Sequence, residues 1–217
     1  MSDARTLSRI LADCTERFVA GGLASSAASR DRGEGPAAPR DPPRDNATIP
    51  PAFRWATLGA RELRRRVARE GAIAEAEAAL GSAGLVLEGP SGSGKTSLAC
   101  ALLRAWEARH PRRRAVFVPA WKLGVARAQH GLGHGEAPEV EQAFIAGLCV
   151  LDDLGSERNT ALNAAPDVIC ARALDGRPTW VTTWMTPEAV TQRYGDGIAR
   201  RLFEAGRAAV IACGKTA

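Results

Sequence analysis

The sequence predicts an α/β domain in which helices cover both faces of a five-stranded, mostly parallel sheet. Three observations lead to this prediction. Five short apolar runs alternate with longer segments of helical periodicity, a glycine-rich loop follows the first run, and two adjacent aspartates follow the third. Short and nearly continuous apolar strands are typical of a parallel sheet that is buried on both sides.

The first 48 residues differ in composition from the remainder of the chain. Apolar residues recur at roughly helical intervals between Leu7 and Val19, which predicts a short helix within residues 1–20. Residues 21–48 are rich in Gly, Ala, Ser, Pro, Arg and Asp without apolar periodicity, a composition typical of a disordered linker. Large apolar residues then return, so residues 49–217 are expected to form the core.

Within the core, the elements follow from apolar runs and from helix-breaking residues. Strands are expected at residues 85–87, 115–118, 148–151, 179–182 and 209–212, where the apolar runs lie. Helices are expected at 59–80, from the glycine-rich loop to 109, near 138–146, near 160–174 and at 187–205. Pro111 ends the second helix, and a loop rich in Gly and His at 131–137 precedes the third.

Composition bears on the cellular setting and on the partners. The five cysteines are widely spread, without the spacing of a zinc site or a disulfide framework, which favours a reducing, cytoplasmic setting. Nothing resembles a transmembrane helix or a signal peptide. The net charge of +5 is uneven, because residues 53–114 sum to +6, residues 1–52 to zero and residues 115–217 to −1. A concentrated basic segment hints at a polyanionic partner, although only three of the 29 basic residues are lysine and a general arginine bias would also produce it.

A phosphate-binding loop follows the first predicted strand. Residues 89–96 read Gly-Pro-Ser-Gly-Ser-Gly-Lys-Thr, which matches G-x-x-x-x-G-K-[ST] between a strand and a helix. Its glycines permit the tight geometry that turns successive amide N–H groups toward phosphates. The candidate nucleotide contacts are Gly89, Pro90, Ser91, Gly92, Ser93, Gly94, Lys95, Thr96 and Ser97. Lys95 is expected to reach the β and γ phosphates and the Thr96 hydroxyl to bind Mg²⁺, so the sequence predicts a P-loop NTPase that binds ATP.

Two aspartates follow the third predicted strand, at the edge of a parallel sheet where ligands bind. Asp152 is assigned to the Mg²⁺ shell together with Thr96, and Asp153 is assigned to polarising the attacking water. A pair of turn-forming aspartates is the alternative. Small-molecule kinases also use a P-loop, so the pair leaves open what is done with the phosphate.

Together, these motifs resemble the AAA+ ATPases of the DnaC/IstB group, which include helicase loaders and transposition helper ATPases. Besides the phosphate loop, the resemblance rests on Leu-Cys-Val-Leu-Asp-Asp-Leu-Gly-Ser-Glu-Arg at 148–158, Gly-Arg-Pro-Thr-Trp-Val-Thr-Thr at 176–183 and Tyr-Gly-Asp-Gly-Ile-Ala-Arg-Arg-Leu-Phe at 194–203. It covers residues 49–214. It implies a P-loop three-layer sandwich, ATP and Mg²⁺ as ligands, and a replicative helicase or a transposase and single-stranded DNA as partners.

The resemblance also implies an arginine finger that a neighbouring subunit supplies in trans, and therefore a homo-oligomer. Helical periodicity leaves Arg200 and Arg201 on two flanks of one helix and does not choose between them. The family pattern places the finger directly before the leucine, which favours Arg201. The alternative is that both arginines solvate the edge of a helix.

One departure from the family concerns the end of the fourth strand. Family members usually have Thr-Thr-Asn or Thr-Ser-Asn, whose asparagine positions water near the γ phosphate, whereas this chain has Thr182-Thr183-Trp184. An indole only donates hydrogen bonds, so Trp184 cannot replace the amide as an acceptor. Thr183 is the expected substitute, or hydrolysis is slow. The chain also ends just past the fifth strand, so the helical lid of many AAA+ proteins is expected to be absent.

Two arginine-rich segments, residues 61–69 and the turn Arg112–Arg114, are candidates for contact with nucleic-acid phosphates. A solvated helix face and a charged loop are the alternatives, and the second is favoured for the turn. His130 and His134 lack partner ligands at metal spacing, so no metal besides Mg²⁺ is expected.

The leading functional hypothesis is a loader or helper that hydrolyses ATP at subunit interfaces in DNA replication or transposition. A nucleotide-gated binding module with little turnover is one alternative, which Trp184 makes credible. A small P-loop phosphotransferase is the other, but the substrate-binding insertion and the mobile lid that it should need are not evident between the strands. Residues 1–48 are expected to bind the partner.

Overall fold

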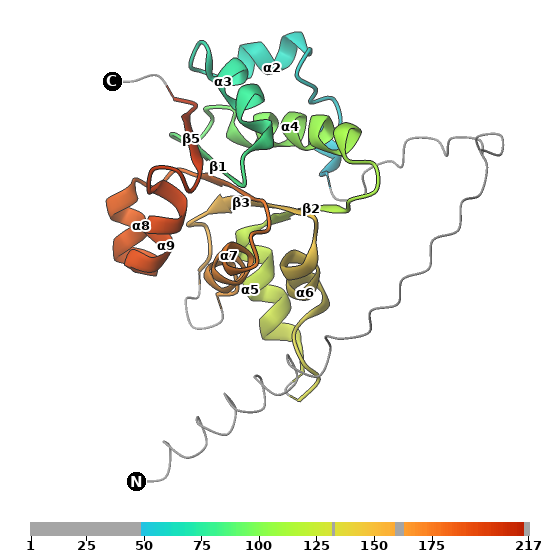
Figure 1. Ribbon diagram of the computed structural model, residues 1–217, viewed down its shortest axis with the longest axis vertical. Coiled ribbons are helices and arrows are strands. Elements are labelled where there is room, and N and C mark those ends of the chain that lie inside the picture. The colour runs from blue at the N-terminus through green and yellow to red at the C-terminus, as the bar shows by residue number, and fades with distance from the viewer. Residues whose placement is uncertain (1–48, 132, 159–162, 215–217) are drawn as a thin grey trace, which may run out of the picture. The chain divides into compact units, whose positions relative to one another are not determined.

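The computed structural model describes residues 49–131, 133–158 and 163–214. In this part of the chain, five strands form one sheet between two layers of helices (Figure 1). The strands are β1 (Gly84–Glu88), β2 (Ala115–Pro119), β3 (Leu148–Leu154), β4 (Thr179–Thr183) and β5 (Ala209–Ala212), in the order β2-β3-β4-β1-β5. The predicted α/β class and five-stranded sheet are confirmed, and the pairings between these strands are all parallel.

The helices form two layers that enclose the sheet. On one side lie α2 (Arg61–Arg66), α3 (Ala72–Ala78) and α4 (Lys95–Arg109), with the short 3-10 turns η1 (Pro51–Phe53) and η2 (Ala79–Gly81). On the other side lie α5 (Ala120–Gln129), α6 (Pro138–Ile145), α7 (Ala165–Leu174), α8 (Pro187–Tyr194) and α9 (Asp196–Phe203). None of the helices in the described ranges combines the length and the apolar composition that a membrane crossing requires.

Side chains along each strand alternate between two apolar cores. In β1, Leu85 and Leu87 pack into the core beneath α4, whereas Val86 packs into the core on the opposite face. In β3, Val150 packs into the core beneath α4 and Cys149 into the core on the opposite face. Both faces of the sheet are therefore buried, which is why the strands read as continuous apolar runs in the sequence.

The predicted helix over residues 59–80 is broken in the structure. The chain leaves the helical conformation at Val67, which is extended, and a second helix begins only at Ala72. Between them the backbone crosses the phosphate loop, where the N–H of Ala68 donates to the carbonyl of Ser93 at 3.3 Å. This contact between segments distant in the sequence overrides the helical periodicity.

The predicted helix over residues 187–205 is also divided, at Gly195. This residue has φ 86° and ψ 163°, a conformation outside every helix and accessible mainly to glycine. Helices α8 and α9 consequently pack against each other as a pair instead of forming one rod. A single glycine within a periodic segment was too weak a signal to predict this break.

Helix α5 follows β2 directly and was not predicted. Only Ala120 and Leu123 are buried along it, whereas Trp121 and Val125 are 43% and 42% exposed. Apolar residues on an exposed face blur the periodicity from which amphipathic helices are predicted. The predicted helix at 5–20 and the linker at 21–48 lie outside the described residues.

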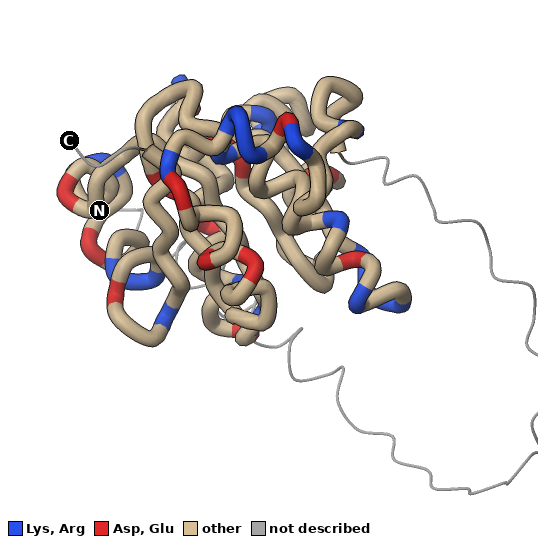
Figure 2. Tube along the Cα trace, turned by 90° about the horizontal axis from the view of Figure 1, so that it is seen from above, with Lys and Arg blue, Asp and Glu red and all other residues tan. Residues whose placement is uncertain are grey.

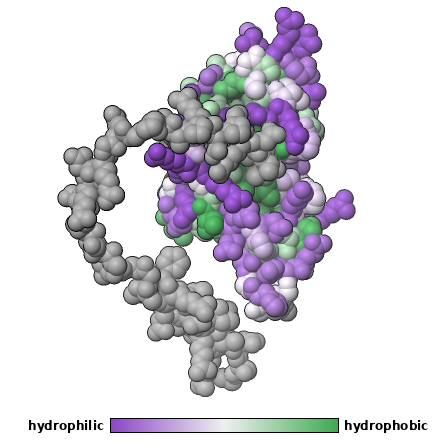
Figure 3. All heavy atoms as spheres, turned by 90° about the vertical axis from the view of Figure 1, so that its right-hand side faces the viewer, coloured by the Kyte–Doolittle hydropathy of each residue, from purple (hydrophilic) through white to green (hydrophobic). Residues whose placement is uncertain are grey.

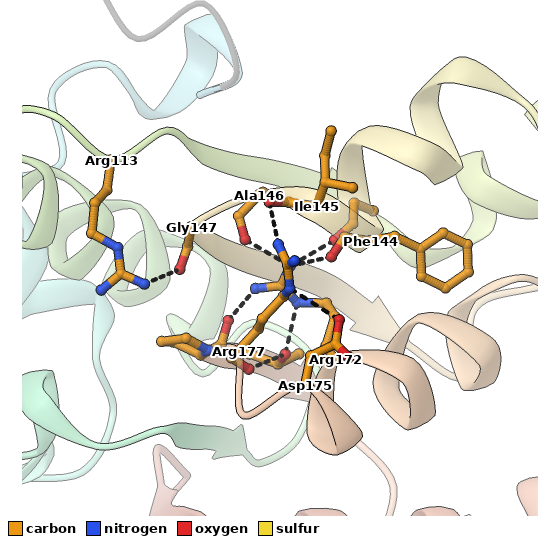
Figure 4. Close-up of polar contacts among 11 residues, drawn as sticks. Arg113, Phe144, Ile145, Ala146, Gly147, Arg172, Asp175 and Arg177 are labelled. Atoms are coloured by element: carbon orange, nitrogen blue, oxygen red, sulfur yellow. Dashed lines mark hydrogen bonds and ion pairs between the residues drawn. The ribbon is translucent and has the colours of Figure 1, made fainter. Parts of the chain in front are cut away.

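One arginine is completely buried at the end of the sheet where the strands begin. Arg172, in α7, donates to the carbonyls of Ala143 (2.9 Å), Phe144 (3.0 Å), Ala146 (2.8 Å) and Pro178 (2.5 Å), and to the Thr179 hydroxyl (2.9 Å) (Figure 4). Three of these carbonyls belong to the last turn and C-cap of α6, where helical partners are lacking. Arg172 therefore ties α6, α7 and β4 together without an ion pair to any described residue.

On the face shown in Figure 3, hydrophilic residues predominate over small and separate hydrophobic patches.

Candidate functional site

Three adjacent strands bring their C-terminal ends to one edge of the sheet. Because β4 lies between β1 and β3, the loop after β1, the aspartates of β3 and the residues that end β4 meet there. A pocket of about 920 Å³ occupies this edge. It is lined by Phe53, Arg66, Pro90, Ser91, Gly92, Gly94, Lys95, Thr96, Ser97, Asp152, Asp153, Thr182 and Trp184.

The phosphate loop passes directly beneath the end of α2. Gly94 has φ 88°, and an added Cβ would lie 2.6 Å from the carbonyl oxygen of Arg66, so only glycine fits there. Helix α4 begins at the next residue, Lys95. The loop thereby presents the N-terminus of a fifteen-residue helix to the pocket, and such a terminus favours anions.

Lys95 is held within the loop by carbonyl groups of the loop itself. Its Nζ donates to the oxygens of Gly89 at 2.7 Å and Pro90 at 2.8 Å. Burial lowers the pKa of Lys95, while Asp152 and Asp153 act in the opposite direction. The ammonium group is thus positioned over the loop, where an incoming phosphate would meet it.

The carboxylate of Asp152 meets two hydroxyl groups inside the pocket. Thr96 Oγ1 donates to Asp152 Oδ1 at 3.0 Å, and Thr182 Oγ1 donates to the same oxygen at 2.7 Å. Burial raises the pKa of Asp152, and these two hydrogen bonds oppose the rise. Thr96 and Asp152, which the sequence placed 56 residues apart, are therefore brought together.

The Thr96 and Asp152 oxygens fit a magnesium ion. Mg²⁺ takes oxygen ligands, and proteins usually hold it through one or two carboxylates together with substrate phosphates. Within residues 49–131, 133–158 and 163–214, no group of three or more His, Cys, Asp or Glu side chains could hold a metal. Phosphate oxygens of a bound nucleotide would have to complete the shell.

Asp153 occupies an irregular point of β3. The register with β4 shifts between Leu151 and Leu154, and Asp153 has φ 58°, the one positive value at a non-glycine residue in the described chain. Its N–H donates to Thr182 Oγ1 at 2.8 Å instead of continuing the ladder. Bulges of this kind re-aim a side chain next to a site, and the exposed Asp153 side chain lines the pocket.

The two threonines that end β4 point in opposite directions. The Thr183 side chain is fully buried away from the pocket, where its hydroxyl donates to Leu154 O at 2.8 Å and accepts from the Met185 N–H at 3.1 Å. The structure therefore does not bring Thr183 to the predicted site. Thr182 lies there instead, because successive side chains of a strand alternate between faces.

Trp184 lies in the wall of the pocket. Its side chain is 54% exposed, and the indole lies close to Gly155 at the end of β3. The position next to the aspartates is therefore occupied by a large apolar ring with one hydrogen-bond donor and no acceptor.

Behind the aspartates, Glu157 connects the pocket to α8, a role that sequence reasoning missed. The buried carboxylate accepts from the Gly155 N–H at 2.9 Å and from the Tyr194 hydroxyl at 2.7 Å, and Arg193 donates to the Glu157 carbonyl. Burial and the bond to Glu157 raise the pKa of Tyr194. The loop after Asp153 is therefore anchored to the helix pair α8–α9.

Arg200 and Arg201 lie on α9 and do not line the pocket of their own chain. Arg201 donates to the Gly197 carbonyl of its own helix at 2.7 Å, while Arg200 Nε lies 3.7 Å from Glu204 Oε2. The Arg200 side chain is exposed, and that of Arg201 is half-buried. Within this chain, neither arginine is placed to contact a nucleotide in the pocket.

The described chain has a three-layer α/β fold with a phosphate loop at one edge of its parallel sheet, and several solved structures share this fold. The DnaC helicase loader superimposes with a TM-score of 0.60 at 21% identity, covering 75% of this chain and 99% of that chain. DnaI superimposes with a TM-score of 0.59 at 20% identity, covering 77% of this chain and 93% of that one. The predicted resemblance to the DnaC group is confirmed at the level of the fold.

A third similar structure is the replication initiator DnaA bound to AMPPCP and single-stranded DNA. Its TM-score is 0.56 at 21% identity, and the match covers 75% of this chain but only 50% of that chain. No protein-family model matches the chain, and no curated protein matches it. At these identities, what the three structures share with this chain is the fold.

Proposed function

We propose that this protein is an AAA+ ATPase that binds ATP and acts as a loader or helper in DNA replication or transposition. The observation that supports this most directly is the meeting of Thr96 and Asp152 at 3.0 Å, beside the ammonium group of Lys95. One cation for the phosphates and two oxygen ligands for a metal are what the chemistry of nucleoside triphosphates requires. Mg²⁺, when bound, would neutralise charge on the phosphates.

Each side chain of the pocket then has a role in this proposal. Lys95 exchanges its bonds to loop carbonyls for the β and γ phosphates, and Thr96 and Asp152 hold the metal. Thr182 fixes the orientation of the Asp152 carboxylate through its 2.7 Å bond, and Asp153 accepts a hydrogen bond from the attacking water. The γ phosphate is then contacted by Arg201 of a neighbouring subunit, so the catalytically active form is a homo-oligomer.

The shared fold also supports one kind of partner over another. The DnaC helicase loader shares it, which supports a replicative helicase as the partner over a transposase. The structure of DnaA was determined with single-stranded DNA, which supports a DNA-associated role. We therefore infer a cytoplasmic protein that assembles on DNA with a helicase.

Replacing Arg201 by alanine should leave ATP binding within about threefold of the unmodified protein and reduce turnover on the order of 10³-fold, as loss of an arginine finger does. Arg200→Ala is the matched control, with the same change on the same helix, and should retain most of the turnover. Turnover per subunit should rise with protein concentration in the unmodified protein, because each site needs a neighbour.

Mixing two inactive variants gives the sharpest form of this test. Lys95→Ala retains Arg201 but lacks the phosphate contact, whereas Arg201→Ala retains the phosphate contact but lacks the finger. If the site is completed in trans, the mixture should regain turnover that neither variant shows alone. A mixture as inactive as its components, or turnover that stays flat with concentration, would contradict the shared site.

Trp184 favours a second candidate function, a nucleotide-gated binding module that turns over slowly. The ring lies in the pocket wall and offers no acceptor to a water molecule. Replacing Trp184 by asparagine should therefore raise the ATPase rate by about tenfold or more, because a positioned acceptor can orient the water. Trp121→Asn, at an exposed tryptophan on α5, is the control and should change nothing. Equal rates for Trp184→Asn and the unmodified protein would show that this residue does not limit hydrolysis.

A further inference from the structure

We propose that the outer face of α2 binds the phosphate backbone of single-stranded nucleic acid. The binding surface consists of Arg61, Arg64 and Arg65, which we call the α2 arginine face. The proposal rests on the proposed function in one respect, because a polynucleotide partner is expected of a DNA-associated ATPase. It adds the surface that contacts this partner.

The three arginines share one face of a short helix. Positions 61, 64 and 65 are related by spacings of three and four residues, which place their side chains next to one another. Leu63 and Val67, on the opposite side, are buried in the core that includes α4. The arginine face is therefore held outward by the packing of the helix beneath it.

These guanidinium groups lack partners among the described residues. All three side chains are exposed, whereas the half-buried Arg69 and Arg127 are paired with Glu75 and Glu136. Glu62, the one acidic residue of α2, forms an ion pair with Arg66 at 2.8 Å. Like charges at these helical spacings repel each other, so the surface is incompletely neutralised until an anion covers it.

Figure 2 shows basic positions gathered along α2 when the molecule is viewed from above. Arg54, which precedes α2 on the same side of the sheet, is also exposed. The Arg54 carbonyl accepts from Arg104 of α4 at 2.8 Å, so α4 fixes the position of this segment. The exposed arginine at position 54 is therefore carried by a segment that hydrogen bonds to α4.

The chemistry of the face favours phosphates. Guanidinium groups bind phosphate oxygens in a bidentate manner, without any requirement for a base sequence. A lipid surface would need an apolar face beside the charges, but Leu63, the apolar residue within α2, is fully buried. A helix of six residues spans only about 9 Å, which suits a flexible single strand better than the long groove of a duplex.

The test compares two variants that lose the same charge. Arg61→Ala/Arg64→Ala/Arg65→Ala removes the α2 arginine face, and Arg109→Ala/Arg112→Ala/Arg114→Ala removes three exposed arginines around the turn before β2. Binding of fluorescein-labelled (dT)20 is measured by anisotropy over a range of salt concentrations. We expect the first variant to bind at least about tenfold more weakly. The slope of the logarithm of its binding constant against the logarithm of salt concentration should be shallower by about two, as three lost phosphate contacts predict for a single strand. The second should stay within about threefold.

Equal loss in both variants, unchanged binding in the first, or no binding of (dT)20 by the unmodified protein would overturn the proposal. The proposal would also be overturned if poly-glutamate displaced labelled (dT)20 as strongly as unlabelled (dT)20 does, because the α2 arginine face would then suit an acidic protein. Thermal unfolding midpoints confirm that the variants fold, and Arg64→Gln/Arg65→Gln replaces the triple change if that unfolds. ATP binding, measured in parallel, separates the two proposals: its absence would remove the proposed function, whereas intact ATP binding with DNA binding insensitive to α2 would remove only this surface.

Discussion

Replacing Lys95 by alanine should weaken ATP binding by about 100-fold or more, corresponding to about 2.7 kcal/mol or more of binding free energy. Hydrogen bonds between charged groups contribute about 1.5–3 kcal/mol each, and Lys95 is placed to donate to more than one phosphate. In the structure, its Nζ is within 2.8 Å of two loop carbonyls, so the ammonium group needs only a small displacement to reach a phosphate. Titration of a fluorescent ATP analogue in the presence of Mg²⁺ measures the effect.

The matched control is Lys122→Ala. Lys122 is exposed on α5, with its ammonium 5.8 Å from the ring centroid of Trp121, and it does not line the pocket. Its removal takes away the same charge and should leave ATP affinity unchanged. A loss of less than threefold for Lys95→Ala, or the same loss for both changes, would show that the loop does not hold the phosphates.

Replacing Arg172 by methionine should lower the free energy of unfolding by about 3–5 kcal/mol, a large share of the total for an ordinary domain. Methionine fills a similar volume but donates no hydrogen bonds. The carbonyls of Ala143, Phe144 and Ala146 and the Thr179 hydroxyl would lose this donor around a fully buried side chain. The Pro178 carbonyl would keep its bond from the Cys149 N–H at 3.2 Å. Each buried acceptor left unpaired costs about 1–3 kcal/mol, and partial entry of water keeps the total below the sum.

Urea unfolding measures this change as a lower midpoint with an unchanged slope. Arg177→Met is the control, because Arg177 donates to Ile145 O at 2.7 Å in the same region but has a side chain 39% exposed. Its loss should cost about 0.5 kcal/mol, since water replaces it. Arg172 lies near the start of the strands, away from the pocket, so ATP affinity per folded molecule should not change. Equal midpoints for the two variants would contradict the structural role of Arg172.

Much of the fold and part of the site could be predicted because the relevant signals are local. The five apolar strands were predicted within about three residues, since both faces of the sheet are buried and each run is continuous. The phosphate loop is a contiguous motif, and Asp152 follows the apolar run of β3 directly. The sheet then brings Thr96 to Asp152 because the strands that precede them end at the same edge.

The remainder depends on contacts between distant segments, which periodicity does not encode. The break after Arg66 depends on the passage of the chain over Ser93, and the choice of Thr182 over Thr183 depends on which of the two side chains points to the face of the sheet that carries the pocket. Arg172 carried no signal at all, because a buried arginine that binds only carbonyls and a hydroxyl looks like any surface arginine in the sequence. Such residues become visible only when hydrogen-bond partners are known.

The anchoring of Glu157 has a consequence for the homo-oligomer that we propose. Its carboxylate accepts from both the Gly155 N–H and the Tyr194 hydroxyl, so it links the turn that follows the aspartates directly to the helix pair that carries Arg200 and Arg201. A shift of the turn after Asp153 would therefore be passed through Glu157 to Tyr194 at the end of α8. In the homo-oligomer that we propose, the phosphate site of one subunit would thereby be coupled to the arginines that this subunit offers to its neighbour.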